Sequence, residues 1–389
     1  MKHFLICFLL CISNISNAVS IEALNPIETL EVLPAGFTKP VKYNITLPQN
    51  YATDTDKSYF VLFDLHPRSQ TYLSGMHDWL SHNGEWPWLK TIIVNPADYH
   101  PEFAATFDKL VEDPNDQSIL NILQNGVLKE VDKKYRTNGY RIYSGFMSNG
   151  ALGLYTLLNR PEMFDAYLIA SPTLANNFAN VVSDAPKKLQ TKYDGLKFLH
   201  MAIGSHNYEK AHIEPFKQFE QALQQLPKAK LDWSSNNNEQ HYYMSRPIIT
   251  VLNGIEALFD DIHHNLAPDS EISKQGASAI IEYYQTLSND KYGFEISAES
   301  SLKALAKTLV KTEPSKALEI YTQTTELYPD SAYAFASLAK AYADQGNIEK
   351  AIEIQEIAVE KSKTMVEWHQ NKHKQYLTEY ENLLNNKLE

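Results

Sequence analysis

The stretch RIYSGFMSNGALGLYTLLNRPEMFDAYLIASPTL, residues 141–174, decides the fold. It opens with a β-branched and aromatic run at residues 141–145, which predicts a strand. An apolar helical pattern follows at residues 151–158, and a second short apolar run fills residues 166–170. A strand, a helix and a strand within about 30 residues predict a βαβ unit, in which the two strands run parallel.

The same alternation extends in both directions, from about residue 41 to residue 259. Short strand-like runs alternate there with helical patterns, which favours a mostly parallel sheet with helices on both faces. Further strands are predicted at residues 59–65, 90–95, 196–202 and 230–233. Helices are predicted at residues 116–135 and 215–226, and the first has an apolar face made of Ile119, Leu120, Leu123, Val127, Leu128 and Val131.

The C-terminal region follows a different pattern. The strand signal stops after Phe259, and from Ile272 onward every segment reads as helical. Residues recur at tetratricopeptide-like offsets, since Ala317, Tyr321 and Pro329 precede Ala351, Gln355 and Lys363 by one period of about 34 residues. One repeat is complete and a second is partial, whereas a free-standing solenoid needs about three. We expect this small all-α region to pack on the rest of the chain or on a partner; a plain helical bundle is the alternative.

The N-terminus predicts export. A basic start precedes a short apolar run, residues 4–12, and the polar stretch after it closes on small residues at Ala18. This pattern is typical of a secretory signal peptide. Because Cys7 and Cys11 would leave with the signal, the mature chain would contain no disulfide. We therefore expect a secreted or periplasmic protein with a signal peptide at residues 1–18, an α/β domain at 19–265 and a helical, tetratricopeptide-like region at 266–389.

Charge and composition exclude several classes of partner. The formal net charge is −12, and the acidic residues are spread along the chain, whereas a nucleic-acid site would need clustered Lys and Arg. No segment beyond the signal reaches the length of a membrane-spanning helix. His263 and His264 stand beside Asp260 and Asp261, but no second ligand pair is spaced for one face, so we expect no metal site there and no cofactor.

Residues 141–174 resemble the bacterial putative-esterase family of esterase D and the siderophore esterases, in which a strand runs into a Gly-x-Ser-x-Gly elbow and then a helix. The resemblance covers roughly residues 41–259 and includes HNGEWP at residues 82–87 and KYRTNG at residues 134–139. It implies an α/β-hydrolase fold. In this register Gly145 is the first elbow glycine, Met147 takes the nucleophile position, Asn149 replaces the second glycine and Gly150 follows it.

A methionine at position 147 cannot act as the nucleophile that such an elbow normally presents. A thioether has no proton to give up and does not attack an ester carbonyl. Ser148 is the alternative nucleophile, with Gly150 two residues later. Its side chain, however, should turn by about 100° from the direction of residue 147. Ser148 would otherwise be a first-turn residue whose hydroxyl satisfies the backbone.

The resemblance also assigns the remaining active-site positions. His66 and Pro67 fall in the oxyanion loop, where proline offers no backbone N–H. His241 is the equivalent of the triad histidine, or else a loop histidine with no task. For the triad acid the loop after residues 196–202 offers Glu209, but no single carboxylate stands out, and a surface glutamate is the expected interpretation of that residue. Trp79, Trp86, Trp88 and Tyr99 are candidates for a pocket wall or for packing between helices and sheet.

Three functional hypotheses follow from these residues. The first is a non-catalytic relative of the esterases that keeps the cleft as a binding or scaffolding surface, for an ester-like small molecule, and uses the helical region for a protein partner. The second is an active carboxylic-ester hydrolase that acts on acyl or siderophore-like esters through Ser148 and His241. The third is a purely structural protein whose cleft has closed. Fold analogy by itself does not decide among them.

Overall fold

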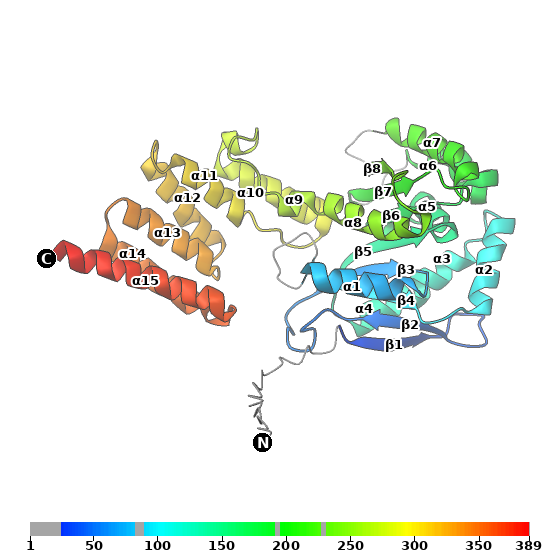
Figure 1. The fold of residues 1–389 in the computed structure, drawn as a ribbon, viewed down its shortest axis with the longest axis horizontal. Helices are drawn as coiled ribbons and strands as arrows, with labels where there is room; N and C mark the ends of the chain where they lie inside the picture. Colours follow the sequence, from blue (N-terminus) through cyan, green and yellow to red (C-terminus); the bar gives the residue numbers. More distant parts are fainter. Residues whose placement is uncertain (1–24, 82–88, 191–194, 227–230, 389) are drawn as a thin grey trace, which may run out of the picture. The chain divides into compact units, whose positions relative to one another are not determined.

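The computed structural model describes residues 25–81, 89–190, 195–226 and 231–388 (Figure 1). The predicted signal peptide, Trp86 and Trp88 lie outside these residues. The chain divides into two compact units, residues 1–137 and residues 138–389. The strand order is β1-β2-β4-β3 in the first unit and β5-β6-β7-β8 in the second.

The first unit contributes two antiparallel and one parallel strand pairing. β1 (Ile27–Val32) pairs with β2 (Val41–Thr46), and β2 pairs with β4 (Thr91–Pro96), in both cases antiparallel. β4 runs parallel to β3 (Tyr59–Asp64). Every residue of β3 and β4 is buried, as expected for the short apolar runs that predicted them.

The helices of the first unit are α1 (Ser69–Ser81), α2 (Pro101–Glu112), α3 (Ser118–Ile122), the π-helix η1 (Leu123–Leu128) and α4 (Lys129–Lys134). The predicted helix at residues 116–135 is therefore a helix with a π segment in its middle. All six residues of its predicted apolar face are buried. The π segment is a local widening that the apolar pattern alone does not reveal.

The second unit begins with a parallel set of strands. β5 (Thr137–Phe146), β6 (Ala166–Ala170), β7 (Lys197–Ile203) and β8 (Leu231–Asn237) pair in this order, all parallel. The helices that follow these strands are α5 (Ser148–Asn159), α6 (Val181–Lys188), α7 (Lys210–Gln224) and α8 (Arg246–Leu258). The βαβ unit predicted from residues 141–174 is thus confirmed as β5-α5-β6.

Two glycines show that α5 and α8 cover opposite faces of these strands. A Cβ at Gly153 in α5 would come within 2.6 Å of the Ile169 side chain, and one at Gly254 in α8 within 2.5 Å of the Leu168 side chain. Successive residues of a strand point to opposite faces. The predicted arrangement of helices on both faces is therefore confirmed for this part of the sheet.

The helical region follows α9 (Asp260–His263). It comprises η5 (Ser273–Gln275), α10 (Ala277–Thr286), the π-helix η6 (Leu287–Tyr292), α11 (Glu299–Leu309), α12 (Pro314–Leu327), α13 (Ala332–Asp344), α14 (Ile348–Lys361), η7 (Ser362–Thr364) and α15 (Glu367–Leu388). Helices α13, α14 and α15 lie side by side in Figure 1. In the part of the chain that the structure describes, no helix has both the length and the apolarity that a membrane crossing requires.

A buried clasp joins the helical region to the end of α8 and to α9. The Lys291 ammonium lies 2.6 Å from the Asp261 carboxylate, with only 6% of the lysine side chain exposed. The Tyr292 hydroxyl donates to the backbone oxygen of Leu258 at 3.0 Å and to Asp261, and its ring stacks on Phe259 with centroids 6.1 Å apart. This contact holds the start of the helical region against the end of α8 and α9; the packing of the repeat helices on the rest of the chain or on a partner stays a prediction.

Candidate functional site

Met147 stands at the turn between β5 and α5, where the sequence register placed it. Its backbone angles are φ 56° and ψ −122°. Few non-glycine residues adopt a positive φ, and a conformation of this kind costs about 1–3 kcal/mol. The turn is fixed on both sides, because the Met147 N–H donates to Ala170 O at 3.1 Å while its own carbonyl accepts from Ala151 and Thr173. The turn between β5 and α5 therefore holds Met147 in a strained backbone conformation.

Position 145 requires glycine because the turn leaves no room for a side chain there. A Cβ at this position would lie 2.6 Å from the backbone oxygen of Asn149 and 2.9 Å from the backbone nitrogen of Gly150. Both contacts are with backbone atoms, which cannot yield without opening the turn. The glycine two residues before position 147 therefore supports the register that puts Met147, and not Ser148, in the nucleophile position.

We expect Gly145→Ala to destabilise the protein by about 1–3 kcal/mol, the usual cost of forcing extra volume into a packed site. Gly75→Ala, at an exposed position of α1 with open space around it, is the matched control and should stabilise by about 0.5–1 kcal/mol. Denaturant unfolding of both variants measures the difference. Equal effects would show that the close backbone approach at Gly145 is not needed.

Ser148 is the first residue of α5, and it is exposed. Its hydroxyl accepts a hydrogen bond from the Thr173 hydroxyl at 3.4 Å, a contact that is too long to be strong. Met147 is also partly exposed, with 38% of its surface accessible. Both side chains thus reach solvent at the start of α5, but only Met147 has the elbow conformation.

His241 lies in the loop between β8 and α8. Its backbone N–H donates to Asn238 O at 3.0 Å. Within the described residues the imidazole ring makes no hydrogen bond, either to Ser148 or to Glu209. A triad needs a nucleophile–histidine bond and a histidine–acid bond, and neither bond joins these three residues.

Glu209 is fully buried, with 1% of its surface exposed, so the interpretation as a surface glutamate is wrong. It lies in the loop after β7, and its carboxylate accepts from the Ser171 hydroxyl at 2.6 Å, from Gly204 N at 3.0 Å and from His206 N at 2.9 Å. A carboxylate that is shielded from water in this way needs a counter-charge. Sequence reasoning favours exposure for any lone glutamate and has no means of seeing these partners.

The counter-charge is Arg246, the first residue of α8, which sequence reasoning missed. Its Nε lies 2.6 Å from Glu209 Oε1, and both side chains are almost completely inaccessible. The guanidinium also donates to Asn238 O. It fills the space beside Gly204, where any Cβ would collide with it. The pair therefore ties together the loops after β7 and β8 and the start of α8.

A row of contacting aromatic side chains begins at Phe146, the residue before Met147. Phe146 contacts Tyr243 with ring centroids 5.1 Å apart, and Tyr243 stacks on His206 at 5.1 Å and 17°. Tyr208 contacts both His206 and Tyr243. Burial, assisted by the negative charge of Glu209, raises the pKa of Tyr243 to about 12, so its hydroxyl stays protonated at neutral pH. None of these aromatic residues was predicted to belong to the site.

Several large side chains in or next to this row are exposed to solvent. Tyr242 is 90% exposed, Met244 71% and Tyr208 69%. Exposed apolar side chains that gather in one place mark binding surfaces more often than isolated ones do. The elbow and the neighbouring loops thus present thioether and aromatic groups to solvent.

The predicted oxyanion loop lies in the first unit, directly after β3. The His66 N–H donates to the Asp64 carboxylate at 2.8 Å, and the Ser69 hydroxyl donates to the same carboxylate at 2.8 Å. Pro67 occupies the turn between them and has no N–H to offer. The loop is therefore held by Asp64 as a local turn at the start of α1.

The other candidates that the structure describes lie on the surface. Trp79 and Tyr99 are 72% and 74% exposed, which does not fit packing between helices and sheet. His264 pairs with Asp260 at 2.6 Å on the surface. The described residues contain no group of three or more His, Cys, Asp or Glu side chains that would hold a metal ion.

Comparisons with known proteins give the fold. No family model and no curated protein is significantly similar to the sequence. In three dimensions the chain is similar to an IroE-like serine hydrolase from Shewanella oneidensis, with 17% identity and a TM-score of 0.58 over 78% of this chain and 100% of that chain. The fold is that of the α/β-hydrolases.

A second solved structure extends the likeness to the helical region. An uncharacterised protein from Capnocytophaga ochracea DSM 7271 matches with 14% identity and a TM-score of 0.65, over 92% of this chain and 100% of that chain. This coverage exceeds what the α/β-hydrolase part supplies, so the α/β-hydrolase fold followed by helices is an architecture that both proteins have. At this identity the likeness concerns the fold alone.

Proposed function

We propose that this protein is a non-catalytic member of the esterase-like α/β-hydrolases, which uses its former active-site surface to bind a ligand. The observation that carries the proposal is Met147, which has φ 56° and ψ −122° in the elbow. In the register that the resemblance implies, residue 147 takes the nucleophile position, and a thioether supplies neither a transferable proton nor a nucleophilic atom for ester attack there.

The surroundings support the same conclusion. The acid candidate Glu209 is bound by Arg246, so its charge is neutralised by a partner that takes no part in proton transfer. The ring of His241 has no hydrogen bond within the described residues, so nothing fixes its orientation or tautomer. What remains is a surface of aromatic rings and thioethers, which is suited to binding apolar or aromatic parts of a molecule.

Incubation with a fluorophosphonate serine-hydrolase probe, followed by intact-mass measurement, tests the proposal. The wild-type protein should gain no adduct and should hydrolyse p-nitrophenyl acetate or butyrate no faster than Ser148→Ala. Labelling of the wild type that Ser148→Ala abolishes would establish the second hypothesis, a carboxylic-ester hydrolase with Ser148 as a displaced nucleophile and His241 as base.

We also propose that the protein is exported and that α11–α14 form tetratricopeptide-like helix pairs. The signal-peptide pattern of residues 1–18 supports export. For the repeats, α12 begins at Pro314 and α14 begins at Ile348, 34 residues later. The buried Ala317 and Ala351 occupy equivalent positions in these helices. The boundary near residue 265 between the α/β domain and the helical region stays a prediction.

A further inference from the structure

The last helix that the structure describes, α15, is attached through few buried side chains. It packs on α14, η7 and α13, and Figure 1 shows it running along this group of helices. Among residues 367–386, His373 and Tyr380 are the two buried side chains, with 0% and 9% of their surfaces exposed. Elements with few buried contacts open at a lower free energy than the rest of a protein. The attachment of α15 therefore depends strongly on His373.

The ring of His373 is buried without a hydrogen bond. Neither Nδ1 nor Nε2 has a partner within the described residues, although a neutral imidazole carries one N–H donor and one acceptor nitrogen. The backbone oxygen of His373 accepts from Gln355 Nε2 at 2.9 Å, and the Tyr333 ring centroid lies 5.1 Å from the imidazole centroid. Most buried polar groups are paired, so an unpaired ring is unusual and calls for a reason.

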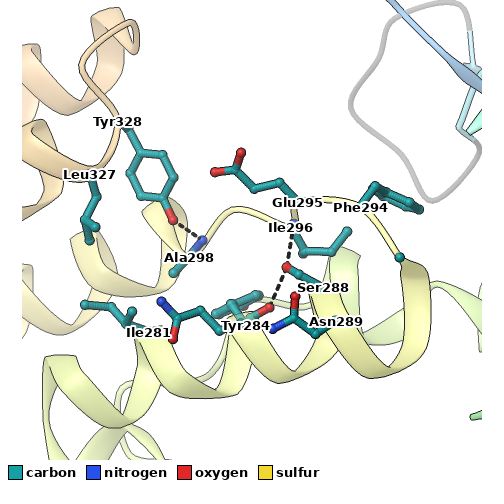
Figure 2. A pocket seen from close by; sticks show the side chains of 12 residues that line it. Ile281, Tyr284, Ser288, Asn289, Phe294, Glu295, Ile296, Ala298, Leu327 and Tyr328 are labelled. Atoms are coloured by element: carbon teal, nitrogen blue, oxygen red, sulfur yellow. Dashed lines mark hydrogen bonds between the residues drawn. The ribbon is translucent and has the colours of Figure 1, made fainter. Parts of the chain in front are cut away.

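Polar groups at an earlier contact in the helical region are paired instead. Figure 2 shows the Ser288 hydroxyl, which accepts from Ile296 N at 2.8 Å. In the same view the Tyr328 hydroxyl accepts from Ala298 N at 2.7 Å. Both hydroxyls thus have backbone partners. The His373 ring differs from them because it is unpaired and because a histidine can take up a proton near neutral pH.

Three polar side chains from α13, α14 and α15 face His373, and none of them is a carboxylate. They are Tyr333, Gln355 and His369, the last of which lies one turn earlier on the same helix. The Gln355 side-chain oxygen is buried and has no partner in the described part of the chain, but it carries no charge. The His369 ring is bonded to the Tyr333 hydroxyl. The ammonium of Lys303 on α11 lies 5.4 Å from the Tyr333 ring centroid, so the charge on this side is positive.

The carboxylates of the surrounding helices are not available to a buried proton. Every carboxylate of α13, α14 and α15 is exposed. Glu360 of α14 is paired with Lys363 of η7 at 2.5 Å, and Glu299 of α11 is paired with Lys303 at 2.7 Å. A proton on His373 would therefore find no buried counter-charge, and a buried charge without one is costly.

The direction of the pH effect follows from this environment. Burial lowers the pKa of His373, and the nearby His369 lowers it further. In the docked helix His373 stays neutral at pH values at which a solvated histidine, with a pKa of about 6.5, is already protonated. The detached helix thus binds more protons, so acid favours detachment. Docking is fully stable above the ordinary pKa and loses stability as the pH falls toward the lowered pKa of the buried ring.

We propose that α15 is an acid-sensitive element, which separates from α13 and α14 when His373 takes up a proton. The other buried side chain of residues 367–386 does not oppose this change, because burial raises the pKa of Tyr380 to about 12 and its hydroxyl keeps the same charge in acid. The elbow is not involved, so the inference stands independently of the proposed function.

Hydrogen–deuterium exchange of the full-length protein, followed by mass spectrometry, tests the proposal at pH 7.5 and pH 5.5, on either side of the ordinary histidine pKa of about 6.5. After correction for the intrinsic pH dependence of exchange, peptides of α15 should exchange about fivefold faster at the lower pH, within the limit of about tenfold for one histidine. Peptides of α13 and of the sheet should change much less. A local measurement is needed because His77 and His200 are also buried, in the α/β part.

Three variants identify the titrating group. His373→Leu removes the ring and keeps an apolar side chain, so the pH effect on α15 should disappear, and His373→Gln should give the same result with a polar side chain. His369→Gln is the matched control, because this histidine lies on the same helix and is only partly buried; it should keep most of the response.

Four results would overturn the proposal. The first is equal exchange of α15 at both pH values, and the second is a wild-type response in both His373 variants. The third is loss of the response in His369→Gln alone. The fourth is faster exchange throughout the helical region and the sheet at pH 5.5, which would show a global loss of stability and not the detachment of one helix.

Discussion

Met147→Ser is expected to give the protein a nucleophile that fluorophosphonate probes label, and to raise ester hydrolysis about 10²-fold over wild type. The backbone already holds residue 147 in the elbow conformation, so the serine hydroxyl would be presented at the start of α5 without any rearrangement. In a serine protease the nucleophile contributes about 10⁶-fold to kcat. An imidazole that is not held in the correct tautomer loses about 10⁴-fold of it, and His241 has no orienting acid.

Three controls accompany this gain of function. Met147→Ala should show no labelling, and His241→Ala in the Met147→Ser background should return hydrolysis to the wild-type rate. Ser148→Ala in the same background should have no effect, because Ser148 is not in the elbow conformation. If Met147→Ser is neither labelled nor more active, residue 147 does not point toward the histidine, and the comparison with the esterase elbow fails.

Arg246→Met should destabilise the protein by about 3–5 kcal/mol, measured by denaturant unfolding at neutral pH. The substitution keeps much of the side-chain volume but leaves the Glu209 carboxylate buried without its counter-charge. Breaking a buried pair by removing one partner usually costs this much. Because Glu209 also accepts three hydrogen bonds, it would retain partners for its oxygens but not for its charge.

The matched control is Lys340→Met, which removes one member of the exposed pair Lys340–Asp344, whose side chains are 68% and 39% accessible. It should change stability by less than about 1 kcal/mol. The double variant Arg246→Met with Glu209→Gln should be more stable than Arg246→Met alone, because the uncompensated charge is gone. A loss of less than about 1 kcal/mol in Arg246→Met would contradict the view that the contact between Arg246 and Glu209 stabilises these loops.

Local patterns predicted most of the α/β part and the elbow. The strands β3, β4, β5, β6, β7 and β8 were each predicted within a few residues, because buried parallel strands read as continuous apolar runs. Met147 lies between β5 and α5 as predicted, because a strand, a turn and a helix are contiguous in the sequence there; its assignment to the nucleophile position stays a prediction. The first two strands were not predicted, and β1 is exposed at four of its six residues, so its apolar signal is weak.

The environment of Glu209 could not be predicted, because its partners are far apart in the sequence. Ser171 and Arg246 follow β6 and β8, and they meet Glu209 only once those strands are in register with β7. Burial of a charged residue also contradicts its usual preference, so a propensity argument gives the wrong answer here. The aromatic row has the same origin, since Phe146 and Tyr243 come from the ends of β5 and the loop after β8.

The clasp of Lys291 and Tyr292 has a consequence for what happens when the polypeptide is cut. The exposed link around residues 264–267 connects α9 to the helical region, and a protease that cleaves there severs the backbone between them. The clasp would still hold the two fragments, because Asp261, Leu258 and Phe259 stay on one side of the cut and Lys291 and Tyr292 on the other. The nicked protein should therefore migrate as one species until denaturant separates its pieces. We therefore expect that cutting the backbone in this link does not by itself separate the two fragments.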